Sequence, residues 1–341
     1  ASDSRRSDLP DAEVWADGLR LGLAFKPLKV SSCLREIEVK HRKLEPTKVR
    51  LALVEHRTSR VHATLAGPRS SGDDRRQPLA AHDIEEPNMG AFPSSLRIVF
   101  RDPAHDDKGP GTYQYPTDAA YVAGSFDLRK VEFIDKGDQV EIQVTVNAPV
   151  LDPWRSADWD GNGFSLQFAQ VYIDTNHVPG AGHTAPLPGL GSVRFAESEA
   201  WDKLVLISPQ GRQRLNSEVR LKAKSMVDDI VIPRRTVARN RTLVATVDKA
   251  ALGQPSKKWG VQVVMQANEG YPSRTDILTR QINETRGAHR FGGGHDTDCD
   301  PHVIDILAGS AKGDAEEAAA QYRALAYICG KTVASLPMVY Q

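Results

Sequence analysis

The sequence predicts a mainly β protein over residues 96–341, an antiparallel β-sandwich with one C-terminal helix. Short runs of alternating apolar and polar residues recur along this stretch, separated by turns rich in Gly, Pro and Asp, which is typical of sandwiches and barrels. Strand-like and helix-like segments do not alternate, so a parallel α/β fold is not expected. Residues 315–328 are rich in helix formers, and Asp314 is placed to be the N-cap or a first-turn acid.

Residues 1–66 are expected to form a basic N-terminal segment with a few strands, followed by a linker at residues 67–95. Residues 1–80 hold 16 Lys and Arg against 11 Asp and Glu, a net charge of +5, so the rest of the chain carries −5. Apolar residues alternate weakly in the N-terminal segment: Leu19, Leu21 and Leu23, then Val49, Leu51 and Leu53. Gly, Pro, Ser, Asp and Arg dominate the linker.

The strands of residues 96–341 are expected from apolar residues at every second position. The clearest run is Val140, Ile142, Val144 and Val146, which a turn at residues 135–138 joins to the preceding strand in a hairpin with one buried face. The other expected strands lie at residues 96–100, 126–133, 164–173, 204–207, 230–232, 243–247 and 261–265.

The charge balance and the missing motifs exclude several functions. Lys+Arg and Asp+Glu both total 44, whereas proteins that bind nucleic acids or anionic membranes rely on an excess of Lys and Arg. No apolar run approaches the roughly 18 residues of a transmembrane helix. The sequence has no nucleophile elbow, Walker loop or zincin helix. We therefore expect no nucleic-acid partner, no transmembrane segment and no recognisable catalytic site.

Residues 101–127 hold the densest group of candidate metal ligands. Asp102, Asp106 and Asp107 lie on a loop whose glycines allow tight turns, and Asp127 follows at the start of the next expected strand. Ca²⁺ takes about six to eight oxygen ligands from carboxylates, backbone carbonyls and water. These four aspartates are therefore candidate calcium ligands. The alternative is a solvated turn held by hydrogen bonds from side chains to the backbone.

Several segments of the sequence resemble a known family. They are DPAHDDKGPGTYQYPT (residues 102–117), GSFDL (124–128), NGFSLQ (162–167), VYID (171–174), FGGGHD (291–296) and VIDIL (303–307). On these motifs, about residues 96–310 are similar to the C-terminal domains of bacterial glucodextranases and amylopullulanases.

The resemblance implies a jelly-roll or DOMON-like β-sandwich, similar to carbohydrate-binding modules. Such domains are usually secreted and attached to a cell-surface glycoside hydrolase, where they bind or anchor rather than hydrolyse. The expected partners are a glycan or cell-envelope polymer and other envelope proteins, and the expected location is secreted, periplasmic or at the cell surface. The first residue, Ala1 rather than Met, fits a processed secreted protein. Calcium in related sandwiches supports Asp102, Asp107 and Asp127 as ligands.

A second acidic loop follows a run of glycines near the C-terminus. Asp296, Asp298 and Asp300 occupy alternate positions, which would point them to the same side of an extended segment. Like charges on one side repel unless water or a cation separates them, so Asp296 and Asp298 are further candidate metal ligands. The alternative is a solvent-exposed loop, and with His295 nearby a transition-metal site is also conceivable.

The three cysteines allow one disulfide. Cys299 and Cys329 flank a short C-terminal stretch and can pair in an oxidising compartment. The alternative is that Cys33, Cys299 and Cys329 are three unrelated buried thiols.

Aromatic residues near expected loops are candidate sugar contacts, because sugar rings stack on aromatic faces. Tyr113, Tyr115, Trp154 and Trp159 are the candidates for ligand binding.

Two other functions remain open at this point. A DOMON-type haem protein would use Met265 with His177 or His183 as axial ligands, although a core methionine explains Met265 as well. A polysaccharide hydrolase is the third hypothesis, and it rests on plentiful carboxylates whose separation the sequence does not give.

Overall fold

The computed structural model describes residues 13–16, 19–23, 36–41, 44–50, 96–271, 274–296 and 299–341. The chain divides into two compact units, Ala1–Pro87 and Asn88–Gln341. The expected linker at residues 67–95 lies outside the described residues.

The N-terminal unit contains a four-stranded antiparallel sheet in the order β2-β1-β3-β4. Its strands are β1 (Glu13–Ala16), β2 (Leu19–Leu23), β3 (Glu36–His41) and β4 (Leu44–Arg50). Val14 and Val39 are buried and lie opposite each other in β1 and β3. The alternating leucines of β2 therefore do form a strand, whereas the expected strand residues after Arg50 lie outside the described part of the chain.

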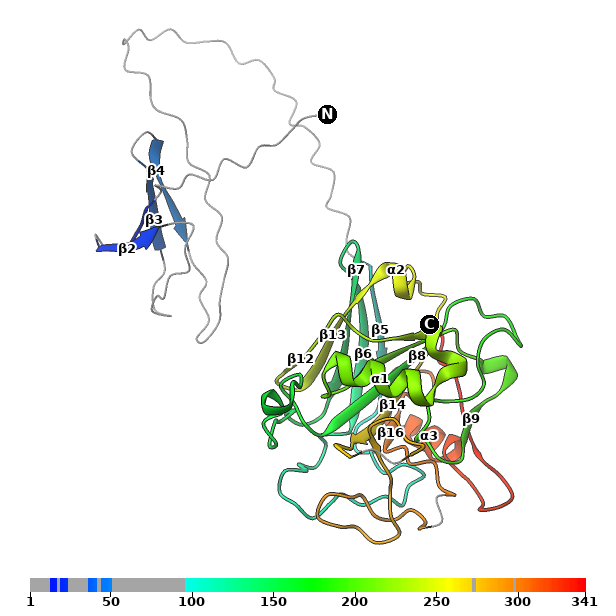
Figure 1. The fold of residues 1–341 in the computed structure, drawn as a ribbon. Helices are drawn as coiled ribbons and strands as arrows, with labels where there is room; N and C mark the ends of the chain where they lie inside the picture. The colour runs from blue at the N-terminus through cyan, green and yellow to red at the C-terminus, as the bar shows by residue number, and fades with distance from the viewer. Residues whose placement is uncertain are drawn as a thin grey trace, which may run out of the picture. The chain divides into compact units, whose positions relative to one another are not determined.

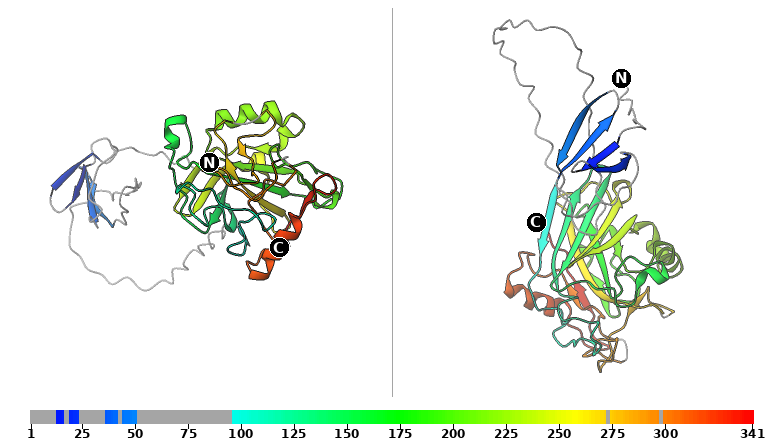
Figure 2. Two further views of the ribbon diagram at one scale, coloured as in Figure 1. Left: turned by 90° about the horizontal axis from the view of Figure 1, so that it is seen from below. Right: turned by 90° about the vertical axis from the view of Figure 1, so that its left-hand side faces the viewer.

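The C-terminal unit is built from two larger sheets (Figures 1 and 2). The first sheet has the order β12-β13-β7-β6-β5, and the second has the order β11-β10-β8-β14-β15, with β16 also paired to β14. The first sheet comprises β5 (Arg97–Arg101), β6 (Leu128–Asp135), β7 (Gln139–Val146), β12 (Arg235–Arg239) and β13 (Thr242–Asp248). The second comprises β8 (Gln167–Asp174), β10 (Lys203–Ile207), β11 (Ile230–Val231), β14 (Gly260–Asn268), β15 (Thr279–Arg280) and β16 (Asp305–Ile306). The short strands β9 (Val193–Phe195) and β17 (Ala334–Leu336) form a separate parallel pair.

The main core lies between these two sheets. Phe133 and Ile142 from the first sheet share one apolar cluster with Val171 and Val263 from the second. All neighbouring strands within the two sheets pair antiparallel, except the parallel pair of β10 and β11. The predicted mainly β sandwich is confirmed.

The two sheets differ in how many of their faces are covered. In β7 buried residues alternate with half-buried ones, because one face of the strand packs on the core. Strands β8 and β14 are buried at every residue. A second apolar cluster, which includes Phe168, Tyr172 and Leu215, covers the outer face of their sheet.

Three short α-helices accompany the sheets: α1 (Arg212–Lys222), α2 (Lys249–Leu252) and α3 (Ala318–Ala324). The expected C-terminal helix is confirmed, but it is shorter than residues 315–328, because a 3-10 turn (Ala315–Glu317) opens it and α3 ends at Ala324. Helix α1 was not expected, because only Leu215 and Val219 of its side chains are buried. None of the helices in the described residues is long and apolar enough to cross a membrane.

Candidate functional site

Five aspartates converge beside the open end of the first sheet, and we call them the acid centre: Asp102, Asp106, Asp107, Asp127 and Asp305. Asp102 follows β5 directly and Asp127 directly precedes β6. Because β5 and β6 are antiparallel neighbours, these two carboxylates meet at the same end of the sheet. Asp305 begins β16 and reaches the centre from the second sheet. Four of the five residues have no exposed surface, and Asp107 is 6% exposed.

Backbone N–H groups fix the orientation of three of these carboxylates. Oδ1 of Asp102 accepts a hydrogen bond from the N–H of Ala308 at 2.9 Å. Oδ2 of Asp305 accepts one from the N–H of Leu128 at 2.6 Å. Oδ2 of Asp127 accepts the N–H of His105 at 2.8 Å and an amide hydrogen of Asn147 at 3.0 Å. Oδ1 of Asp305 also accepts the N–H of Ile306 at 3.0 Å, so both oxygens of Asp305 and one oxygen each of Asp102 and Asp127 are anchored.

Four other oxygens of the acid centre have no hydrogen-bond partner in the part of the chain that the structure describes. Within the described residues, Oδ2 of Asp102, both carboxylate oxygens of Asp106 and Oδ1 of Asp127 are buried and accept no hydrogen bond. Asp102, Asp106 and Asp305 each offer one oxygen, and these atoms lie within 4.8 Å of one another. Buried polar atoms nearly always have a partner. This arrangement is therefore the one expected of ligands that surround a cation.

Electrostatics point the same way. Burial raises the pKa of Asp102 and of Asp305 well above the usual range, and the neighbouring carboxylates raise both further. Burial, followed by the charge of Asp127, raises the pKa of Asp106 to about 7. The guanidinium of Arg129 offsets the raised pKa values of Asp102 and Asp106 only in part. A divalent cation among the oxygens would remove the repulsion that these pKa values express.

Tyr115 fastens the loop that carries Asp107. The Tyr115 hydroxyl donates a short hydrogen bond to Asp107 and accepts the N–H groups of Gly124 and Phe126 at 3.1 Å each. Burial and the adjacent carboxylate raise the pKa of Tyr115, so the hydroxyl stays protonated and remains a donor. Tyr115 therefore has a structural position in the loop.

The C-terminal segment closes the acid centre from the other side. Gln321 of α3 donates to the backbone oxygen of Asp106 and accepts the N–H of Ile306 at 2.9 Å. Glu317 holds the preceding loop, because its carboxylate accepts the N–H groups of Ser310 at 2.7 Å and Gly313 at 2.8 Å, as well as that of Lys312. Two segments about 200 residues apart in the sequence are thus tied together around one site.

The sequence did not single out Asp305, although a signal was present. Asp305 stands in the middle of the apolar run Val303, Ile304, Ile306 and Leu307, where a charged residue needs a specific partner. Every residue of that run is buried.

The described acids of the second acidic loop have hydrogen-bond partners of their own. Oδ1 of Asp296 accepts the N–H of Glu284 at 2.7 Å. The third acid, Asp300, is buried and accepts hydrogen bonds from the hydroxyl of Tyr113 at 3.0 Å and the N–H of His295 at 3.3 Å. Asp298 lies outside the described residues, so Asp296 and Asp298 as metal ligands stay predictions.

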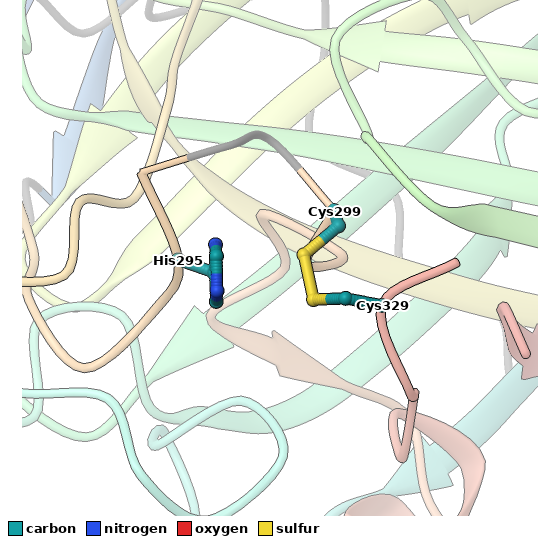
Figure 3. A group of neighbouring side chains, drawn as sticks. All are labelled: His295, Cys299 and Cys329. Carbon is teal, nitrogen blue, oxygen red and sulfur yellow. A yellow bond between two sulfur atoms is a disulfide. The ribbon is translucent and has the colours of Figure 1, made fainter. Parts of the chain in front are cut away.

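Cys299 and Cys329 form a disulfide across a separation of 30 residues, as one of the two alternatives foresaw. His295 lies beside the bond (Figure 3), and the three side chains could otherwise hold a metal. The sulfur atoms are bonded to each other and are not thiolate ligands. Cys33 lies outside the described residues.

The four aromatic candidates differ in how they are packed. Tyr113 is only 4% exposed and belongs to an apolar cluster under the loops, and half-buried Tyr115 and Trp154 pack against that cluster. Trp159 is half-buried and belongs, like Trp154, to the loop between β7 and β8. Because the Tyr115 hydroxyl is committed to Asp107, the two tryptophans are the better placed of the four for contact with a ligand.

The residues proposed for haem ligation lie in different surroundings. Met265 is fully buried in the main core. His183 is paired with Asp229 at 2.8 Å, and the His177 ring stacks on Tyr340 with centroids 4.2 Å apart. No contact among the described residues joins Met265 to either histidine.

A family model described as the C-terminal binding module, SLH-like, of glucodextranase matches residues 98–340. The chain belongs to this family. The match covers nearly the whole C-terminal unit and includes every residue of the acid centre. A search of curated proteins gave no match. The C-terminal unit is therefore a binding module of the glucodextranase type.

Proposed function

We propose that residues 98–340 form a non-catalytic module that binds a glycan or a related cell-envelope polymer. We further propose that bound calcium stabilises the folded state of this module. The family match supports glycan binding, because it describes a binding module of glucodextranase. The acid centre supports calcium binding. The disulfide supports a secreted, periplasmic or cell-surface location, because disulfides persist in oxidising compartments.

The donor set of the acid centre suits calcium. Four unpartnered oxygens and one from Asp305 are available, and water completes a set of about six to eight. Zinc sites use His and Cys ligands, and the acid centre has neither. Magnesium usually keeps several waters and takes only one or two carboxylates. A centre with so many protein oxygens therefore favours the larger ion.

Calcium in this position would join three parts of the fold. Asp102 and Asp127 lie at the ends of β5 and β6 in the first sheet, and Asp305 lies in β16 of the second. The ion binds only when all three are assembled, so it stabilises the folded state alone. At a calcium concentration of about 100 times Kd, this stabilisation is about 2.7 kcal/mol.

Calcium removal tests this part of the proposal. We expect Tm to fall when EDTA is added to the purified chain, to recover with CaCl₂, and to recover less with MgCl₂. Metal analysis should find calcium in the untreated protein. An unchanged Tm in EDTA together with no bound calcium would refute the assignment.

Affinity electrophoresis tests the glycan part. The purified chain is run through gels that contain dextran, pullulan or soluble cell-wall polysaccharide, with an inert protein of similar size as control. We expect retardation in at least one gel and no release of reducing ends from any polymer. Equal mobility in every gel would overturn the glycan proposal, and released reducing ends would overturn its non-catalytic part.

A further inference from the structure

The loop at residues 152–163 is unusually well fixed for a surface segment, and we call it the tryptophan loop. The carboxylate of Asp152 accepts the N–H of Ser156 at 2.9 Å and its hydroxyl at 2.8 Å, as well as the hydroxyl of Ser165. The N–H of Trp154 in turn donates to the Ser165 hydroxyl oxygen at 3.3 Å. One carboxylate thus organises both ends of the loop.

The backbone of the tryptophan loop is held in a strained form. Arg155 (φ 48°) and Asp160 (φ 57°) are non-glycine residues in the left-handed region, and they flank the 3-10 turn Ser156–Trp159. Such strain persists only where the surroundings enforce it, and it concentrates at functional sites. The contacts of Asp152 supply the enforcement here.

The loop presents two indoles in fixed positions. The Trp154 ring meets the rings of Tyr121 and His289 edge-on, with centroids 6.2 and 5.7 Å away. The guanidinium of Arg280 lies over one face of the Trp154 ring, 5.6 Å from its centroid, which leaves the other face for a ligand. The Trp159 indole N–H donates to the backbone oxygen of Trp154 at 3.1 Å. Both tryptophans keep part of their surface exposed.

Charged side chains with fixed directions border Trp154. Glu269, which is 9% exposed, is paired with Arg280 at 3.3 Å and with Arg290 at 3.4 Å. Arg280 also donates to the backbone oxygen of His289 at 2.7 Å. These pairs place hydrogen-bond acceptors and donors next to an aromatic ring. Proteins bind ligands that have both apolar faces and hydroxyl groups with this combination of side chains.

An open cavity adjoins the far end of the loop. Asn162 lines it and donates to the backbone oxygens of Ser208 and Gln210 at 2.9 Å each. Arg212, the first residue of α1, also lines the cavity. Ser208 and Gln210 are buried and supply a fixed polar part of the cavity wall, beside apolar residues such as Leu206 and Ile232.

We infer that the tryptophan loop is the glycan-binding surface of the module. Pyranose rings stack on Trp154 and Trp159, the Glu269–Arg290 pair bonds hydroxyls beside Trp154, and the cavity at Asn162 receives hydroxyls beyond Trp159. The ligand class is a hexopyranose oligosaccharide, because its rings have apolar C–H faces and hydroxyl edges that match these groups. This inference rests on the proposed glycan function and gives it a location.

Calorimetric titration with isomalto- and malto-oligosaccharides tests the location. We expect Trp159→Ala and Glu269→Gln each to weaken binding about tenfold or more, as is usual for a central contact. Trp154→Phe keeps the packing against Tyr121 and His289 and should weaken binding less. Leu221→Ala, at a residue that is 65% exposed on α1, is the control and should bind like the unmodified chain. Tm and near-ultraviolet circular dichroism verify that each variant is folded.

The outcomes separate the location from the function. If the unmodified chain binds a glycan and folded Trp159→Ala and Glu269→Gln variants bind it equally well, the location is wrong and the proposed function stands. If the unmodified chain binds none of the sugars and none of the polymers tested by electrophoresis, the glycan function fails and this inference fails with it.

Discussion

Asp106→Asn is the sharpest test of the acid centre, because it should act in opposite directions with and without calcium. Neither carboxylate oxygen of Asp106 accepts a hydrogen bond, so the substitution breaks no contact within the described residues. It removes one negative charge from a crowded, buried group and one potentially bidentate ligand from the cation. Without calcium the variant should be the more stable chain, and with calcium it should gain far less than the unmodified chain.

The magnitude follows from the pKa of Asp106, which burial and Asp127 raise from 3.8 to about 7. At about 1.36 kcal/mol per pKa unit, keeping Asp106 ionised at pH 8 costs the folded, cation-free chain about 4 kcal/mol. Because the folded-state pKa is the raised one, this loss of stability grows as the pH rises from about 4 to 7. A domain of this size shifts its Tm by about 2–4 °C per kcal/mol, so the variant should melt up to about 8–16 °C higher in EDTA.

Differential scanning calorimetry at pH 8, in EDTA and in a calcium series, measures both effects. Asp228→Asn is the matched control, because it also removes one carboxylate but at an exposed position. The control should change neither the melting temperature in EDTA nor the response to calcium by more than about 1 °C. An Asp106→Asn variant that is less stable in EDTA, or that responds fully to calcium, would refute the reasoning.

Three further results are expected. Glu317→Ala removes the charged acceptor that holds the N–H groups of Ser310, Lys312 and Gly313, so it should lower stability by about 1–3 kcal/mol. Amide exchange at Ser310 should become faster, and unchanged exchange would contradict this role. Reduction of the Cys299–Cys329 disulfide, which spans 30 residues, should lower the free energy of unfolding by about 3–4 kcal/mol. The Tm should therefore be lower in dithiothreitol, and an identical Tm would contradict a stabilising disulfide. Burial alone would raise the pKa of Glu132, but hydrogen bonds from Lys130 and Arg97 outweigh it and the net shift is downward. The stability from Glu132 is therefore present above its unfolded-state pKa and lost as the pH falls through the folded value. In a Glu132→Gln variant, Tm should fall less steeply as the pH is lowered into the acid range. An unchanged dependence of Tm on pH would contradict this role of Glu132.

Local pattern was enough to predict most of the strands that form the main core, but it missed β9, β12, β15, β16 and β17 and helix α1. The alternation in β7 is visible because one of its faces packs on the core and the other does not. Helix α1 escaped prediction because its sequence is polar and only Leu215 and Val219 face the protein. The C-terminal helix was overestimated because residues 325–328 share its composition, although the chain there turns toward the disulfide.

The acid centre was predictable only in part for a different reason. Four of its members lie within 26 residues, so their proximity can be read from spacing. Asp305 arrives through the pairing of β16 with β14, which spacing does not reveal. The same limit applies to Tyr113, a loop aromatic that resembles a sugar contact in sequence but whose hydroxyl is committed to Asp300, 187 residues away.

The distance in sequence between Asp102 and Asp305 has a consequence for how the module is made. A nascent chain that has not yet reached residue 305 cannot complete the donor set, and a completed chain without the cation must bring buried like charges together. If calcium fills the centre as proposed, ion binding would offset this repulsion and favour the closed sandwich. A module exported as proposed would then gain stability where calcium is plentiful, so the supply of the ion would decide where its fold is secured.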